Sequence, residues 1–93
     1  MDNTNHDTII RMFYMLQLIE PLIDAKGNET VKKSNQELKA AIITYLYSCK
    51  MSEEAEPVSE RLAWSLEVFK YLHILEIKTN AFNEALNDWK RNE

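Results

Sequence analysis

The chain has very few of the residues that build loops and cross-links. Its 93 residues include one cysteine, one glycine and two prolines. A single cysteine, Cys49, excludes an intrachain disulfide, and one glycine is too few for the phosphate-cradling loops that most nucleotide enzymes use. Stability must therefore come from burial of apolar side chains, and we expect a single domain over residues 1–93.

The sequence also lacks a long uninterrupted apolar run. Its most apolar stretch, from Ile9 to Ile23, contains Arg11, Glu20 and Pro21 and falls short of the ~20 apolar residues that cross a bilayer. We therefore expect no membrane helix. No Lys or Arg precedes Arg11, so we also expect no secretory signal peptide. We predict a reduced, cytoplasmic protein.

Positive charge is scarce as well. Eleven Lys and Arg stand against fifteen Asp and Glu, which gives a net charge of −4 and a pI near 5.2. General affinity for phosphate backbones comes mainly from Lys and Arg, so nucleic acid is an unlikely partner. With 45% hydrophobic and 28% charged residues, the chain has the composition of a folded domain rather than of a disordered one.

What the sequence does contain is helical periodicity, first over residues 8–24. Asp7 or Thr8 is the expected N-cap, Gly27 is expected to end the helix in a left-handed conformation, and we expect a bend before Pro21. The apolar residues with three-and-four spacing are Ile9, Met12, Phe13, Leu16, Ile19 and Ile23.

A second amphipathic helix is predicted over residues 35–50, after a connection at residues 25–34. Ser34 followed three residues later by Glu37 has the spacing of a capping box, which satisfies two free amides at a helix start. Its apolar stripe consists of Leu38, Ile42, Tyr45, Leu46 and Cys49.

The third predicted helix covers residues 57–91, with Pro57 in its first turn, where a missing amide hydrogen costs nothing. It contains no later Gly or Pro. A heptad row runs along it with alternating spacings of four and three residues: Val68, Leu72, Leu75, Thr79, Phe82, Leu86 and Trp89.

These lengths predict an all-α, small helical bundle of three helices. The third helix would be roughly 52 Å long and the other two ~25 Å each, so neither short helix could cover it alone. Either it breaks near Thr79-Asn80 to give a fourth helix, or it stays continuous and pairs with a second copy. We favour the second, a homodimer. Its predicted interface is Val68, Leu72, Leu75, Phe82, Leu86 and Trp89.

A search for catalytic and metal-binding patterns predicts neither an enzyme nor a cofactor. His6 and His73 are the only histidines, and no paired Cys or His-Glu-x-x-His pattern occurs. His73 and Glu76 are a single reversed pair, whereas di-metal bundles use two Glu-x-x-His pairs. Cys49 lies on an apolar stripe, where it is expected as a buried hydrophobe.

Protein binding is the function that the sequence favours. Tyr and Trp supply much of the energy of protein interfaces, and we predict a non-enzymatic regulator or inhibitor that docks on another protein. The candidate partner-binding residues are Tyr47, Trp64, Tyr71 and Trp89.

Two alternatives stay open. The segment from Lys26 to Lys39 carries four Lys against two Glu, and Asn35 and Gln36 would start the second helix, as in a nucleic-acid-binding transcriptional regulator. A structural assembly subunit is the other alternative.

Overall fold

A computed structural model of the chain describes residues 3–92, and the side chains of residues 6–92. Three helices account for nearly all of it: α1 (Asn3–Lys26), α2 (Glu29–Glu54) and α3 (Val58–Arg91). Within the described range no strand is present, so the predicted all-α fold is confirmed.

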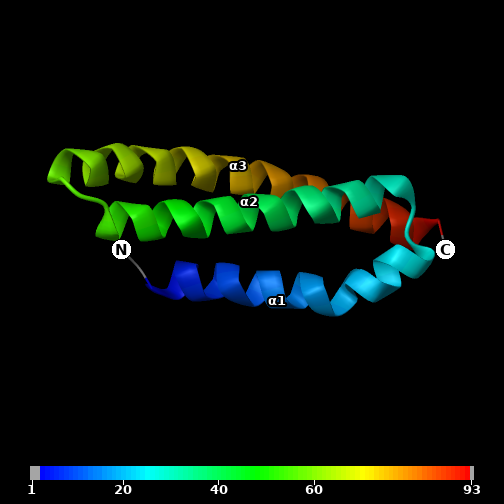
Figure 1. Cartoon of the computed structure of the whole chain (residues 1–93). Coiled ribbons are helices and arrows are strands. Elements are labelled where there is room, and N and C mark those ends of the chain that lie inside the picture. The colour runs from blue at the N-terminus through cyan, green and yellow to red at the C-terminus, as the bar shows by residue number, and fades with distance from the viewer. Residues whose placement is uncertain (1–2, 93) are drawn as a thin grey trace.

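The helices form an elongated bundle with α2 in the centre, as Figure 1 shows. Helices α2 and α3 form an antiparallel hairpin and pack along their length, whereas α1 packs on α2 less closely. The backbones of α1 and α3 stay apart over their described residues. The principal extents are 52 × 20 × 19 Å, so a single layer of side chains between helices makes the whole core.

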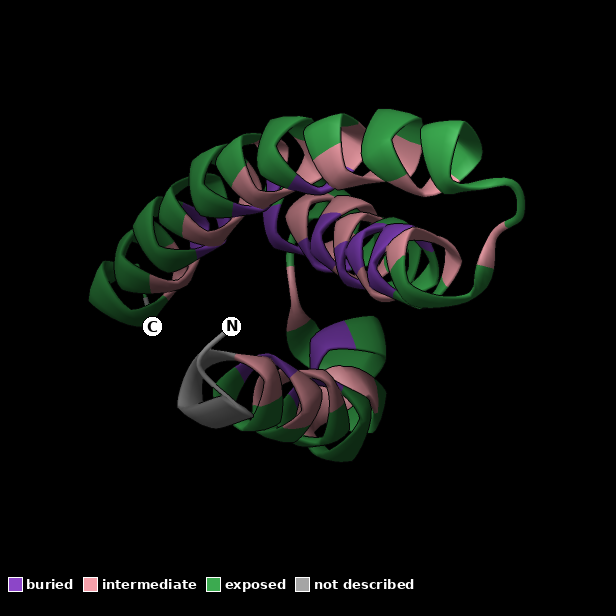
Figure 2. Ribbon diagram, turned by 90° about the vertical axis from the view of Figure 1, so that its left-hand side faces the viewer, coloured by how far each residue is buried: buried purple, intermediate pink, exposed green. Residues whose placement is uncertain are grey.

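The core follows the predicted apolar stripes. Helix α1 contributes Ile9, Leu16 and Ile23, spaced seven residues apart, and all three are buried. Buried apolar residues of α2 and α3 belong to the same core, and Figure 2 shows the buried positions in purple on the inner sides of the ribbons. These residues are Val31, Leu38, Ile42, Tyr45, Cys49, Val68, Leu75, Phe82 and Ala85.

The predicted start of the second helix at residue 35 was wrong. Helix α2 begins at Glu29, and Asn28 is its N-cap, because the Asn28 side-chain oxygen accepts a hydrogen bond from the Val31 amide at 2.9 Å. Ser34 lies inside the helix rather than at a capping box. The missed signal is Val31, which lies seven residues before Leu38 on the same stripe and is fully buried.

Gly27 does not end α1 in a left-handed conformation, since no glycine of the described chain has a positive φ. A Cβ atom at this position would lie 2.6 Å from the Ile23 carbonyl oxygen and 2.7 Å from Val31 Cγ1. Glycine is therefore needed because α1 and α2 approach each other closely at their junction, and not because of backbone freedom.

The start of α1 also differs from the prediction. The helix begins at Asn3, so Asp7 and Thr8 lie inside it and do not form its N-cap. Pro21 is within the helix, which continues to Lys26. We expected a bend before this proline. Figure 1 shows the last turns of α1 inclined toward α2.

Helix α3 is continuous through Thr79 and Asn80, so the described chain has no break there and no fourth helix. Its heptad row is covered within the chain: Val68, Leu75 and Phe82 are buried, and Leu72, Leu86 and Trp89 are half-buried against the same core. The row predicted as a dimer interface is thus used for intrachain packing.

The physical reason is the length of α2. Its 26 residues give a helix of about 39 Å, against ~24 Å for the predicted residues 35–50. A helix of that length covers most of α3, which has 34 residues. A homodimer therefore requires another surface.

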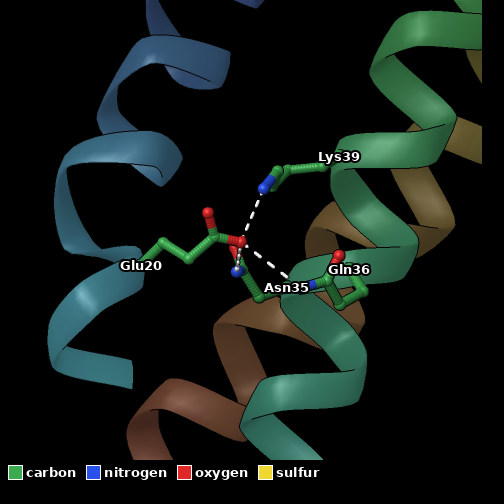
Figure 3. A network of polar contacts seen from close by, with 4 residues as sticks. All are labelled: Glu20, Asn35, Gln36 and Lys39. Carbon is green, nitrogen blue, oxygen red and sulfur yellow. Dashed lines mark hydrogen bonds and ion pairs between the residues drawn. The ribbon is translucent and has the colours of Figure 1, made fainter. Parts of the chain in front are cut away.

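A polar cluster fixes the position of α1 on α2, as Figure 3 shows. One oxygen of Glu20 accepts hydrogen bonds from Lys39 Nζ at 2.5 Å, Gln36 Nε2 at 3.3 Å and Asn35 Nδ2 at 3.4 Å. The Lys39 and Glu20 side chains are only 17% and 25% exposed, so their attraction is less screened than that of a surface pair. The cluster sets which turn of α1 faces which turn of α2.

Candidate protein-binding surface

Three of the predicted partner-binding residues come together along one side of the α2–α3 hairpin. Tyr47 of α2 and Trp64 of α3 meet edge to face, with ring centroids 5.6 Å apart and planes at 82°. Trp64 and Tyr71 lie two helical turns apart on α3 and line one shallow hollow of about 480 Å³. We call Tyr47, Trp64 and Tyr71 the aromatic surface.

A second hollow of about 290 Å³ lies on the other side of Tyr71. Its floor is formed by small residues of α2, namely Ala40, Ala41 and Thr44, together with Ile74 of α3. The Thr44 hydroxyl donates to the Ala40 carbonyl at 2.9 Å, so it offers little free polarity to the hollow. Small side chains on α2 thus leave Tyr71 standing between two depressions.

Sequence reasoning missed this second hollow. The signal was present in α2, where Ala40, Ala41 and Thr44 place small residues on adjacent positions of one helical face. Which neighbour those small residues would face depends on the pairing of α2 with α3, and no spacing within α2 specifies it.

Charged residues surround the aromatic surface and pair with one another. Lys78 Nζ lies 3.2 Å from Glu37 Oε1, and Lys70 Nζ lies 3.6 Å from Glu67 Oε2 and 5.4 Å from the Tyr71 ring centre. The Lys70–Glu67 side chains are 62% and 41% exposed and the Lys78–Glu37 side chains 35% and 41%, so each pair is partly screened by water and contributes little to stability. An apolar centre with a polar, ion-paired margin is typical of protein-binding patches.

Trp89 does not join the other three. Like Tyr71, it is half-buried against the core, but it lies eighteen residues beyond Tyr71 on α3, which corresponds to about 27 Å along the helix. This distance separates Trp89 from the aromatic surface.

Cys49 is buried at 4% exposure, as the sequence predicted. Burial raises the pKa of its thiol above 9.0, the nearby Glu53 carboxylate raises it further, and a hydrogen bond with Tyr45 opposes both. A thiol that stays protonated and covered is a poor nucleophile. His73 is exposed on α3, and among the residues that the structure describes no three His, Cys, Asp or Glu side chains are grouped to hold a metal ion.

The lysine-containing segment from Lys26 to Lys39 is partly engaged. Lys39 is bound to Glu20, and Lys32 lies 3.9 Å from Glu29. Asn35, expected at the exposed start of a recognition helix, is fully buried in the second turn of α2. Fewer side chains are thus available to contact phosphates or bases than the sequence suggested.

No helix in the described part of the chain is long and apolar enough to cross a membrane. Comparisons with protein-family models, with curated proteins and with solved structures found no match to this chain.

Proposed function

We propose that the protein is a non-enzymatic regulator that binds a segment of another protein on the aromatic surface. The observation that supports this most strongly is the grouping of Tyr47, Trp64 and Tyr71 on one side of the hairpin, with a hollow on either side of Tyr71. Side chains of this kind bury large areas at a small entropic cost and dominate interface energies. A cytoplasmic location and an inhibitory action belong to the same proposal.

The chemistry of the surface indicates the kind of segment that would bind. The two hollows share Tyr71 but differ in their chemistry: the one beside Ala40 and Ala41 is mainly apolar, whereas the one beside Trp64 is also lined by Glu60, Glu67 and Lys70. An apolar side chain of a partner helix would fill the first hollow, and a side chain with a polar end, one or two turns away, would fill the second. The paired charges of Lys70 and Lys78 at the margin would then meet polar residues flanking that helix.

The test is affinity capture with matched variants. Trp64→Ser and Tyr71→Ser remove rings from the aromatic surface, whereas Ile77→Ser removes an apolar side chain that is 52% exposed elsewhere on α3. We expect the wild type and Ile77→Ser to capture one stoichiometric partner and both aromatic-surface variants to lose it. Circular dichroism checks that all variants are folded.

Two results would count against the proposal. One is capture of the same partner by the Trp64 and Tyr71 variants at wild-type yield, which would move the binding site elsewhere. The other is the absence of any stoichiometric partner from a native lysate.

The nucleic-acid alternative has less support, because Lys39 and Asn35 are engaged inside the bundle. Salt-dependent retardation of nucleic acid at low ionic strength would revive it. A homodimer also stays a proposal, on a surface other than the covered heptad row.

A further inference from the structure

Two groups of large apolar side chains are exposed, one on α1 and one on α3. The α1 patch consists of Tyr14, Met15, Leu18 and Leu22, which are 51–80% exposed. The α3 stripe consists of Val58, Leu62, Leu66 and Phe69, which are 58–72% exposed. Both groups have the three-and-four spacing of a single helix face.

A groove of about 680 Å³ lies between α1 and α3, and Phe69 is the member of the two groups that lines it. Its walls are Ile9 and Met12 of α1 and Phe69 and Leu72 of α3, and Tyr45 of α2 lies between them. Met15 follows Met12 by one turn, and Phe69 belongs both to the groove and to the α3 stripe. In Figure 2 the ribbons of α1 and α3 lie apart from each other. The groove therefore borders the α3 stripe at Phe69 and ends one turn from the α1 patch, and its lining also includes polar residues such as Glu76 and Asn80. We refer to the α1 patch, the groove and the α3 stripe together as the α1–α3 face.

The exposed area is large enough for a stable interface. With about 200 Å² for a fully exposed large apolar side chain, each group exposes about 500 Å², and the two together expose about 1,000 Å². The largest apolar patch of a typical monomer is about 300–600 Å². A standard protein interface needs about 800 Å² from each partner. Each group alone thus lies within the range of a monomer, and the two together expose as much area as one half of a stable dimer needs.

We propose that a second copy of this chain covers this face, with the α1 patch of each copy lying on the α3 stripe of the other. The two groups match in area and in length, since residues 14–22 and 58–69 correspond to about 12 and 16 Å of helix. A twofold axis repeats the contact, so each copy uses both of its groups and the assembly closes as a dimer.

The dimer leaves the aromatic surface free. On α3, Trp64 and Tyr71 differ from Leu62 and Phe69 by two residues, which places the two sets about 160° apart around the helix. The inference is therefore independent of the proposed function, and either can fail without the other.

The first experiment measures absolute mass by light scattering over a concentration series. We expect a dimer of twice the chain mass of 11.0 kDa. Leu18→Glu and Leu66→Glu each place a charge in an apolar contact, and we expect each to weaken dimerisation about 100-fold or more. Ile43→Glu is the matched control, because Ile43 is 56% exposed on α2 and belongs to neither group.

The second experiment tests the arrangement. Equal amounts of Leu18→Cys and Leu66→Cys chains are mixed and oxidised; Cys49 is buried and does not compete. We expect a covalent dimer that joins one chain of each kind, and much less of either same-variant dimer.

Three results would overturn the proposal. The first is a monomeric wild type at every concentration, and the second is a dimer that Leu18→Glu and Leu66→Glu leave intact. The third is a mass that grows without limit, which would indicate an open rather than a twofold contact. Because the exposed positions carry no core packing, circular dichroism should show wild-type helicity in all three glutamate variants.

Discussion

Replacing Gly27 by alanine tests whether α1 and α2 meet as closely as the structure shows. Glycine-to-alanine changes at a negative φ normally stabilise a protein by about 0.4–1 kcal/mol, because alanine restricts the unfolded chain. Gly27 has no positive φ, so this gain is available. The expected sign of the change is nevertheless the opposite.

The reason is the space around the missing Cβ atom. It would lie 2.6 Å from the Ile23 carbonyl oxygen and 2.7 Å from Val31 Cγ1. The carbonyl also accepts a hydrogen bond from the Gly27 amide at 2.7 Å, so it cannot move away without weakening that bond. Val31 is fully buried and has few alternative rotamers. Overpacking of this kind costs about 1–3 kcal/mol, which leaves a net loss of about 1–2 kcal/mol.

The assay is thermal unfolding followed by circular dichroism at fixed protein concentration. A loss of that size lowers Tm by about 5–15 °C in a domain of this length. The double variant Gly27→Ala/Val31→Ala relieves one of the two contacts, so it should lose less stability than the sum of the single variants. A higher Tm for Gly27→Ala would refute the close approach, and additive losses would show that Val31 does not contribute to it.

Three further outcomes follow from the core and the polar cluster. Lys39→Met leaves the half-buried Glu20 carboxylate without its cation and should cost about 1–3 kcal/mol in urea unfolding; adding Glu20→Gln should recover part of that loss, and no recovery would argue against the pair. Burial and the hydrogen bond with the Cys49 thiol raise the pKa of Tyr45 from 10.0 to about 12. The folded state therefore favours the protonated phenol, so its contribution to stability is full below pH 10 and about 2–3 kcal/mol is lost as pH rises to 12. Tyr45→Phe should lack that part of the decline, and an identical pH profile would contradict it. Phe82→Ala should cost about 3–5 kcal/mol, whereas Ile77→Ala, at 52% exposure, should cost about 0.5 kcal/mol; equal losses would contradict the burial of Phe82 against α2.

The positions where prediction and structure differ share a cause. The capping box at Ser34 has the right local chemistry, but a longer helix buries Val31 and satisfies its first amides through Asn28 instead. Burial of a complete side chain contributes about 1.5–3 kcal/mol, which exceeds the contribution of about 1 kcal/mol from a single cap. Tertiary packing therefore extended α2 beyond its strongest local start signal.

The same extension changed the interpretation of the apolar rows. The pattern in α3 correctly identified Val68, Leu75 and Phe82 as residues that need a cover, but periodicity within one helix does not indicate which helix provides it. Once α2 is about 39 Å long, the row is covered within the chain. The exposed apolar area shifts to the α1 patch and the α3 stripe.

The sequence by itself determined the all-α class, the number of helices and the inward residues of each, because the 3.6-residue period fixes which side chains share a face. It also indicated Tyr47, Trp64, Tyr71 and Trp89 as candidate partner-binding residues. Only the tertiary structure decided that the first three lie on one side of the hairpin, that Trp89 lies apart, and that the open side lies between α1 and α3. The reason is that a helical pattern fixes the direction of each side chain around its own axis, whereas the position of one axis relative to another depends on long-range contacts such as Gly27 with Val31 and Glu20 with Lys39.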